Sequence, residues 1–117
     1  MARPCKFKKV CHMPVNLSFG PLQSESNGEI IMTVDEYEAI RLMDYSTFTQ
    51  EEASVQMKIA RTTFQRLYEN ARKKIAKALI DGLKLKIEGG NYVLCDGTEI
   101  HCRCGGCQKH KIITKGE

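Results

Sequence analysis

The chain has 117 residues, of which 42% are hydrophobic, and its formal net charge is +4. That length suits one domain with a modest core and excludes two full domains. No apolar run approaches the ~18 residues that cross a bilayer, and the first residues are basic and polar rather than an apolar leader. We therefore expect a cytoplasmic protein that binds no membrane.

Charge is distributed unevenly along the chain. Residues 33–57 hold six acids and one base, a sum of −5, whereas residues 58–77 hold seven bases and one acid, a sum of +6. Such a change of sign between neighbouring segments indicates a surface for a polyanion. A solvated charged helix would give the same pattern, so charge alone does not decide between the two.

The first predicted elements are a strand and a helix. Residues 1–28 are basic at the start and then rich in Pro, Ser, Asn and Gly, which predicts a loosely structured segment. A short strand is expected at Glu29–Met32. A helix is predicted to begin at Thr33, because Thr33 and Glu36 have the spacing of a capping box. Tyr37 and Ile40 follow at helical spacing and are its expected buried pair.

Two further helices are predicted. The capping-box spacing recurs at Thr49 and Glu52, and it predicts a two-turn helix at about 50–57. A longer basic helix follows at about 61–80, with Gly82 as its C-terminal stop. One apolar stripe holds this helix to the domain, and it consists of Phe64, Leu67, Ala71, Ile75 and Ala78.

A β-hairpin is predicted after the helices. The runs 83–87 and 92–94 are short and alternating, and Gly89 and Gly90 lie between them as a turn. These two glycines lack the helix and lysine that a phosphate-binding loop needs. The helical carboxylates are explained as helix caps and a solvated face. Since no catalytic constellation stands out, we expect that the protein is not an enzyme.

A short helix, a tight turn and a longer basic helix form a helix-turn-helix, whose second helix enters the major groove of double-stranded DNA. Arg66 and Gln65 carry donors that read guanine and adenine edges, and Lys73 suits a phosphate. An ordinary three-helix domain with a charged surface would show the same periodicity. The predicted DNA-binding residues are Arg61, Thr62, Thr63, Gln65, Arg66 and Lys73.

The stretches Thr49–Ala53, Ile59–Leu67 and Ala71–Ile75 resemble region four of the bacterial sigma factors. The resemblance implies a sigma-region-four-like fold and RNA polymerase as a second partner. It also carries the sigma contact positions onto Arg61, Thr62, Thr63, Gln65 and Arg66. The chain departs from the sigma pattern at Lys58, where glycine is favoured, and at Ala60, where Ser or Thr is favoured as the helix N-cap.

A second set of motifs covers nearly the whole chain. It consists of Arg3–Pro4, Phe19–Pro21, Asp35–Leu42, Gln50–Ala53, Ala60–Thr63 and Ile87–Gly90. Together these motifs resemble a small prokaryotic family of uncharacterised proteins that are predicted to bind DNA. Members of that family also tend to end in a Cys-, Gly- and His-rich tail, as this chain does after Cys95.

Six cysteines without a secretory leader favour metal ligands or buried thiols over a disulfide framework. Thiolates and imidazoles suit zinc, an iron–sulfur cluster or copper(I). Unligated thiols and a redox disulfide are the alternatives, and His12 is expected to be a surface residue. The main candidate ligands are Cys95, Cys102, Cys104 and Cys107, and further candidates are Cys5, Cys11, His101 and His110.

We therefore predict a mainly α fold, in which residues 29–95 form a three-helix, sigma-region-four-like helix-turn-helix domain with a short C-terminal β-hairpin. A basic segment, 1–28, precedes it and a Cys/His-rich tail, 96–117, follows it. The predicted function is sequence-specific DNA binding in transcriptional regulation. The alternatives are a metal-binding protein and an adaptor that docks on polymerase. A homodimer is also favoured, because one helix-turn-helix seldom binds DNA tightly alone.

Overall fold

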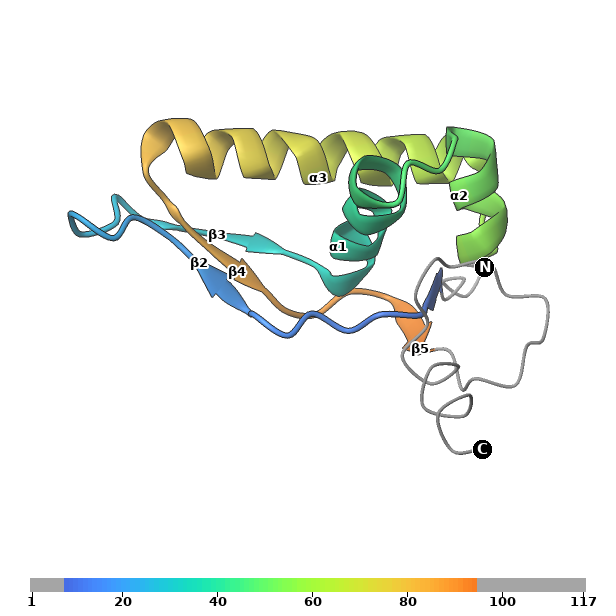
Figure 1. Cartoon of the computed structure of the whole chain (residues 1–117), viewed down its shortest axis with the longest axis horizontal. Coiled ribbons are helices and arrows are strands. Elements are labelled where there is room, and N and C mark those ends of the chain that lie inside the picture. Colours follow the sequence, from blue (N-terminus) through green and yellow to red (C-terminus); the bar gives the residue numbers. More distant parts are fainter. Residues whose placement is uncertain (1–7, 95–117) are drawn as a thin grey trace, which may run out of the picture.

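The computed structural model describes residues 8–94, and Figure 1 shows their helices lying along one side of the strands. The helices are α1, Val34–Ile40, which continues as a π-helical turn, η1, Arg41–Tyr45; α2, Gln50–Met57; and α3, Arg61–Asp81. No helix within this range is long and apolar enough to cross a membrane.

Local sequence signals set the helix ends. At the start of α1, the Thr33 hydroxyl accepts from the Glu36 backbone N–H at 3.3 Å, and the Glu36 carboxylate accepts from the Thr33 N–H at 2.9 Å. Thr49 and Glu52 make the same reciprocal pair at the start of α2. At the end of α3, Gly82 is left-handed, with φ of 69°. Both predicted capping boxes and the predicted C-terminal stop are confirmed.

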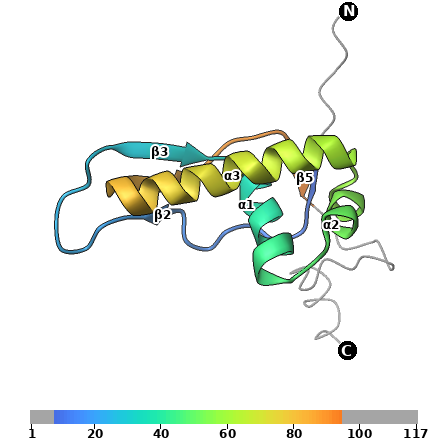
Figure 2. The same cartoon turned by 90° about the horizontal axis from the view of Figure 1, so that it is seen from above.

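The strands form two small sheets. In the larger sheet, β4 (Lys84–Ile87) is the central strand, antiparallel to β2 (Ser18–Phe19) and parallel to β3 (Glu29–Met32). The smaller sheet pairs β1 (Lys8–Val10) in parallel with β5 (Tyr92–Leu94). Seen from above, α3 lies over the larger sheet, between β2 and β3 (Figure 2).

The prediction of a mainly α fold with one C-terminal hairpin is wrong, because residues 8–94 form a small mixed α/β domain with five strands. Both edges of β4 are already occupied, by β2 and β3, so β5 has no edge of β4 on which to fold back. The Gly89–Gly90 turn instead lies at the start of α1, where the Gly89 carbonyl accepts from the Val34 N–H at 2.9 Å. The chain then reaches the free edge of β1.

The N-terminal segment also differs from expectation. Residues 1–28 were expected to be loosely structured, yet β1 and β2 both lie within them. Their pairing partners are β5 and β4, which lie more than 60 residues further along the chain. The local β-strand propensity of residues 1–28 does not predict such long-range pairing, because a strand of two or three residues is stabilised by its partner strand.

Two clusters of buried apolar side chains form the core, and α3 contributes to both. Near α2, Phe64 packs in a cluster with Ala39, Leu42, Ala53 and Met57. Two helical turns later, Ala71 packs in a second cluster with Val10, Met32, Val34 and Ile87. The N-terminal half of α3 is therefore held by α1 and α2, and its C-terminal half by the strands.

Three carboxylates of α1 are buried, which corrects the expectation of a solvated face, whereas the expected role of Glu36 as a helix cap is confirmed. Glu38 is 0% exposed and makes a bidentate pair with Arg41, with N–O distances of 2.8 and 2.9 Å. Glu36 bonds Lys74 of α3 at 2.7 Å, and Asp35 lies 3.3 Å from Lys8. Buried carboxylates need such cations, since an isolated charge in the interior is very costly.

Phe64→Ala should lower the free energy of unfolding by about 3–5 kcal/mol, because it opens a cavity in the cluster around α2. Urea denaturation followed by circular dichroism measures this change. Val55→Ala, at an exposed position on α2, should change stability by no more than about 0.5 kcal/mol. An unchanged midpoint for Phe64→Ala would mean that the buried face of α3 is assigned incorrectly.

Arg41→Ala should lower the free energy of unfolding by about 3–5 kcal/mol, because it leaves the buried Glu38 carboxylate without its cation. The control is Lys77→Ala, which breaks the exposed pair with Asp81 and should cost no more than about 1 kcal/mol. Chemical denaturation of both variants compares the two losses directly. Equal losses would contradict the burial of the Glu38–Arg41 pair.

Candidate nucleic-acid interface

All six predicted DNA-binding residues lie on α3, and all six are exposed. At ~100° per residue, Thr62, Arg66 and Lys73 form one row along the helix. This row lies opposite Phe64 and Ala71, which are both 0% exposed. The burial of the apolar stripe therefore fixes which side chains the helix presents outward. The exposed polar residues Asn70 and Arg72 flank the same row and extend the set that sequence reasoning selected.

Some hydrogen-bond donors of this face already bond another side chain, and others do not. Arg61 Nε donates to Gln50 Oε1 of α2 at 3.3 Å, and Gln65 Nε2 donates to Glu69 Oε2 at 3.4 Å. Among residues 8–94, Arg66 and Lys73 have no hydrogen bond or ion pair. Their cationic groups are therefore available to a ligand without first breaking an internal contact.

Burial changes the charge balance that the sequence suggests. Asp35, Glu36 and Glu38 are half of the six acids in residues 33–57, and they are neutralised inside the domain. Of the bases, Lys74 is engaged by Glu36. The exposed face of α3 then keeps Arg66, Arg72 and Lys73 against one acid, Glu69, and it is a net cationic surface.

Tyr68 ties α3 to the end of the first helix. Its ring stacks on Phe64 with centroids 6.0 Å apart, and its hydroxyl donates to Asp44 Oδ1 of η1 at 2.9 Å. Burial raises the pKa of Tyr68, and the bond to Asp44 raises it further. The hydroxyl therefore stays protonated as a donor at neutral pH. Arg72 lies over the same ring, 5.5 Å from its centroid.

The connection between α2 and α3 consists of residues 58–60. Lys58 caps α2 in the left-handed conformation, with φ of 59° and ψ of 43°, a region that glycine adopts at the lowest cost. Ala60 is the N-cap of α3 and makes no side-chain hydrogen bond. The chain departs from the sigma pattern at these same two positions. The left-handed backbone at position 58 favours glycine, and the N-cap at position 60 favours Ser or Thr, as in the sigma sequences.

The candidate metal ligands lie mostly outside the described residues. These are Cys5, Cys95, His101, Cys102, Cys104, Cys107 and His110. Cys11 is described and is 2% exposed, and its sulfur accepts from Gln56 Nε2 at 3.6 Å. Within residues 8–94 no three His, Cys, Asp or Glu side chains are grouped as metal ligands would be. Metal binding stays a prediction.

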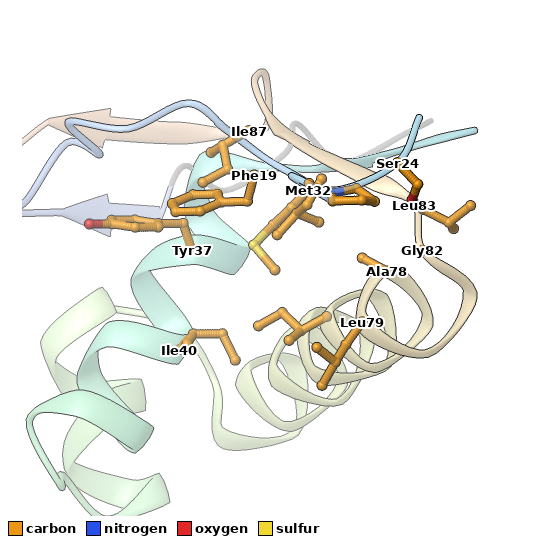
Figure 3. Close-up of a pocket in the computed structure, with 14 residues that line it drawn as sticks. Phe19, Ser24, Met32, Tyr37, Ile40, Ala78, Leu79, Gly82, Leu83 and Ile87 are labelled. Carbon is orange, nitrogen blue, oxygen red and sulfur yellow. The ribbon is translucent and has the colours of Figure 1, made fainter. Parts of the chain in front are cut away.

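A pocket of about 620 Å³ lies beside the second core cluster, between α1, the C-terminal half of α3 and the larger sheet. Figure 3 shows Phe19 and Met32 on one side and Leu79 on the other. Tyr37 and Ile40, the expected buried pair of the first helix, line this pocket and are only partly buried. Sequence reasoning missed it, because the strand that carries Phe19 lay in the segment expected to be loose.

Comparison of the chain with known proteins identifies a matching protein family. Residues 1–95 match the model of a family described as "Protein of unknown function DUF134". A UPF0251 protein of Desulfitobacterium hafniense is 50% identical over 95% of this chain and 90% of the relative. A UPF0251 protein of Caldicellulosiruptor saccharolyticus is 43% identical over 90% of this chain and 75% of the relative. No solved structure matches.

Ala60→Ser should raise the free energy of unfolding by about 1 kcal/mol, because the new hydroxyl can accept from the Thr63 N–H at the start of α3. Urea denaturation measures the gain. Ala60→Val adds bulk without an acceptor and should give no gain. A serine variant no more stable than the valine variant would show that the start of α3 does not need this cap.

Proposed function

This chain belongs to the DUF134 family, whose members are also named UPF0251 proteins, and we propose that it binds double-stranded DNA. In this proposal α2, residues 58–60 and α3 form a helix-turn-helix, with α3 as the recognition helix. The observation that carries the proposal is the exposed cationic row on α3, directly opposite Phe64. Sequence-specific binding would make the protein a transcriptional regulator.

The dimensions of α3 suit the major groove. Its 21 residues span about 31 Å, and a groove about 12 Å wide admits one helix. The first turn of α3 follows α2 at one end of the molecule, away from the β2–β3 connection (Figure 1). Base contacts concentrate at this end of a recognition helix, where the helix dipole also favours a phosphate.

Each exposed side chain then has a chemical role. Arg66 is free among residues 8–94 and can donate two hydrogen bonds to one guanine. Gln65 can read adenine after it exchanges its bond with Glu69, and the released carboxylate can accept from a cytosine amino group. Lys73 lies two turns further along the row, where it would contact phosphate and position the helix.

Arg66→Ala should weaken binding to a selected operator by about 1–3 kcal/mol and relax the sequence preference at one position. Lys73→Ala should instead weaken binding to all sequences alike and reduce the salt slope by about 1. The operator comes from a random-library selection with the full chain. Fluorescence anisotropy over a range of salt concentrations then gives both affinity and slope.

The matched control is Lys77→Ala, which removes a lysine of α3 that already pairs with Asp81 and should leave affinity nearly unchanged. Wild-type affinity in both folded test variants would refute α3 as the recognition helix. Failure of the selection to enrich any sequence, with no salt-dependent binding, would refute DNA binding itself.

A further inference from the structure

Asn70 is an exposed residue of α3 that takes no part in the packing of the domain. It lies in the middle of the helix, between Arg66 and Lys73, and its side chain faces solvent. Within the part of the chain that the structure describes, its amide makes no hydrogen bond. Asparagine is less favourable than alanine inside a helix, because its side chain competes for backbone hydrogen bonds. Positions that depart from local preference in this way are often functional.

The spacing of Asn70 and Arg66 suits two contacts in one groove. The two residues are four positions apart, so they lie about 40° apart around α3 and about 6 Å apart along its axis. Each base pair of DNA advances about 3.4 Å. Side chains with this spacing therefore reach base pairs that are one or two steps apart. No described helix or strand lies over the side of α3 that faces away from the strands (Figure 1), so a groove can lie along it.

The two edges of the exposed row differ in their internal contacts. Gln65, on the edge opposite Asn70, carries the same amide group, but it donates to Glu69 at 3.4 Å. Arg72, on the same edge as Gln65, lies over the Tyr68 ring, 5.5 Å from its centroid. Of the two amides, that of Asn70 can therefore bind a base without first breaking a contact among residues 8–94.

We propose that Asn70 reads an adenine, one or two base pairs from the guanine that Arg66 reads. The asparagine amide presents a donor and an acceptor side by side, and these match N7 and the N6 amino group of adenine in the major groove. The amide is uncharged, so it adds base discrimination and no phosphate attraction. This inference rests on the proposed function, because it takes α3 as the recognition helix. It adds a specificity-determining residue that sequence reasoning did not select.

The order of residues along α3 fits this assignment. Arg66 and Asn70 both lie in the first half of the helix, and base contacts concentrate toward that end of a recognition helix. Lys73 follows Asn70 by three positions, about 4.5 Å further along the axis. Contacts to bases would then end at Asn70, and contacts to phosphate would begin at Lys73.

The test compares the base preferences of wild type and Asn70 variants on the operator selected with the full chain. Fluorescence anisotropy measures binding to that operator and to operators in which one base pair at a time is replaced. Wild type should prefer adenine at the Asn70 position by about 10- to 100-fold. Asn70→Ala should reduce that preference to about two-fold or less and leave the guanine preference of Arg66 intact. The salt slope should not change, because no charge is removed.

A second variant tests for a new preference rather than a loss. Asn70→Arg should change the preferred base at this position from adenine to guanine, because arginine donates to guanine O6 and N7. A solvated surface residue would produce no such change. The urea midpoint of Asn70→Ala should rise by about 0.3–0.5 M, which also shows that the variant is folded. Asn16→Ala removes an exposed asparagine in the β1–β2 connection and should leave every base preference unchanged.

Three results would overturn the inference. Asn70→Ala could retain every base preference, it could lose one more than about two base pairs from the guanine that Arg66 reads, or Asn70→Arg could still prefer adenine. If Arg66→Ala relaxes the guanine preference in the same experiment, the proposed function stands without this inference. If wild type binds no DNA, the proposed function fails, and this inference fails with it.

Discussion

The shared use of α3 by two core clusters is the constraint on which the rest of the structure depends. Phe64 belongs to the cluster with α1 and α2, and Ala71 belongs to the cluster with the strands. The two residues are seven positions apart, so both lie on the same side of the helix. Since that side is buried at two separate places, α3 has little freedom to rotate, and the orientation of its exposed row is fixed over its whole length.

Buried charge complements this apolar packing. Glu36 accepts a backbone hydrogen bond that caps α1 and also pairs with Lys74, so the start of one helix is bonded to the middle of another. Glu38 likewise bonds Arg41 and the backbone N–H of Cys11, next to β1. Such groups are costly unless fully paired, and they therefore favour one relative placement of the elements that they join.

The sequence predicted the features that depend on neighbouring residues. The caps at Thr33 and Thr49 and the stop at Gly82 are made by residues a few positions apart, and the face of α3 follows from helical periodicity. The sequence did not predict what depends on distant partners. Gly89–Gly90 looked like a hairpin turn because nothing nearby shows that β4 is already paired on both edges. The pocket was missed for the same reason, since it is lined by Phe19 and Leu79, which are far apart in the sequence.

The parallel pair of β1 and β5 has a consequence for the order of folding. Lys8 lies opposite Tyr92, so this contact closes a loop that includes nearly the whole described chain. Closing so long a loop has an entropic cost that local contacts such as those between α2 and α3 avoid, and contacts of this kind form late. During synthesis, Val10 is made 84 residues before Leu94, its partner in β5. The strand β1 therefore stays unpaired, with the side chain of Val10 unburied, until β5 has been made.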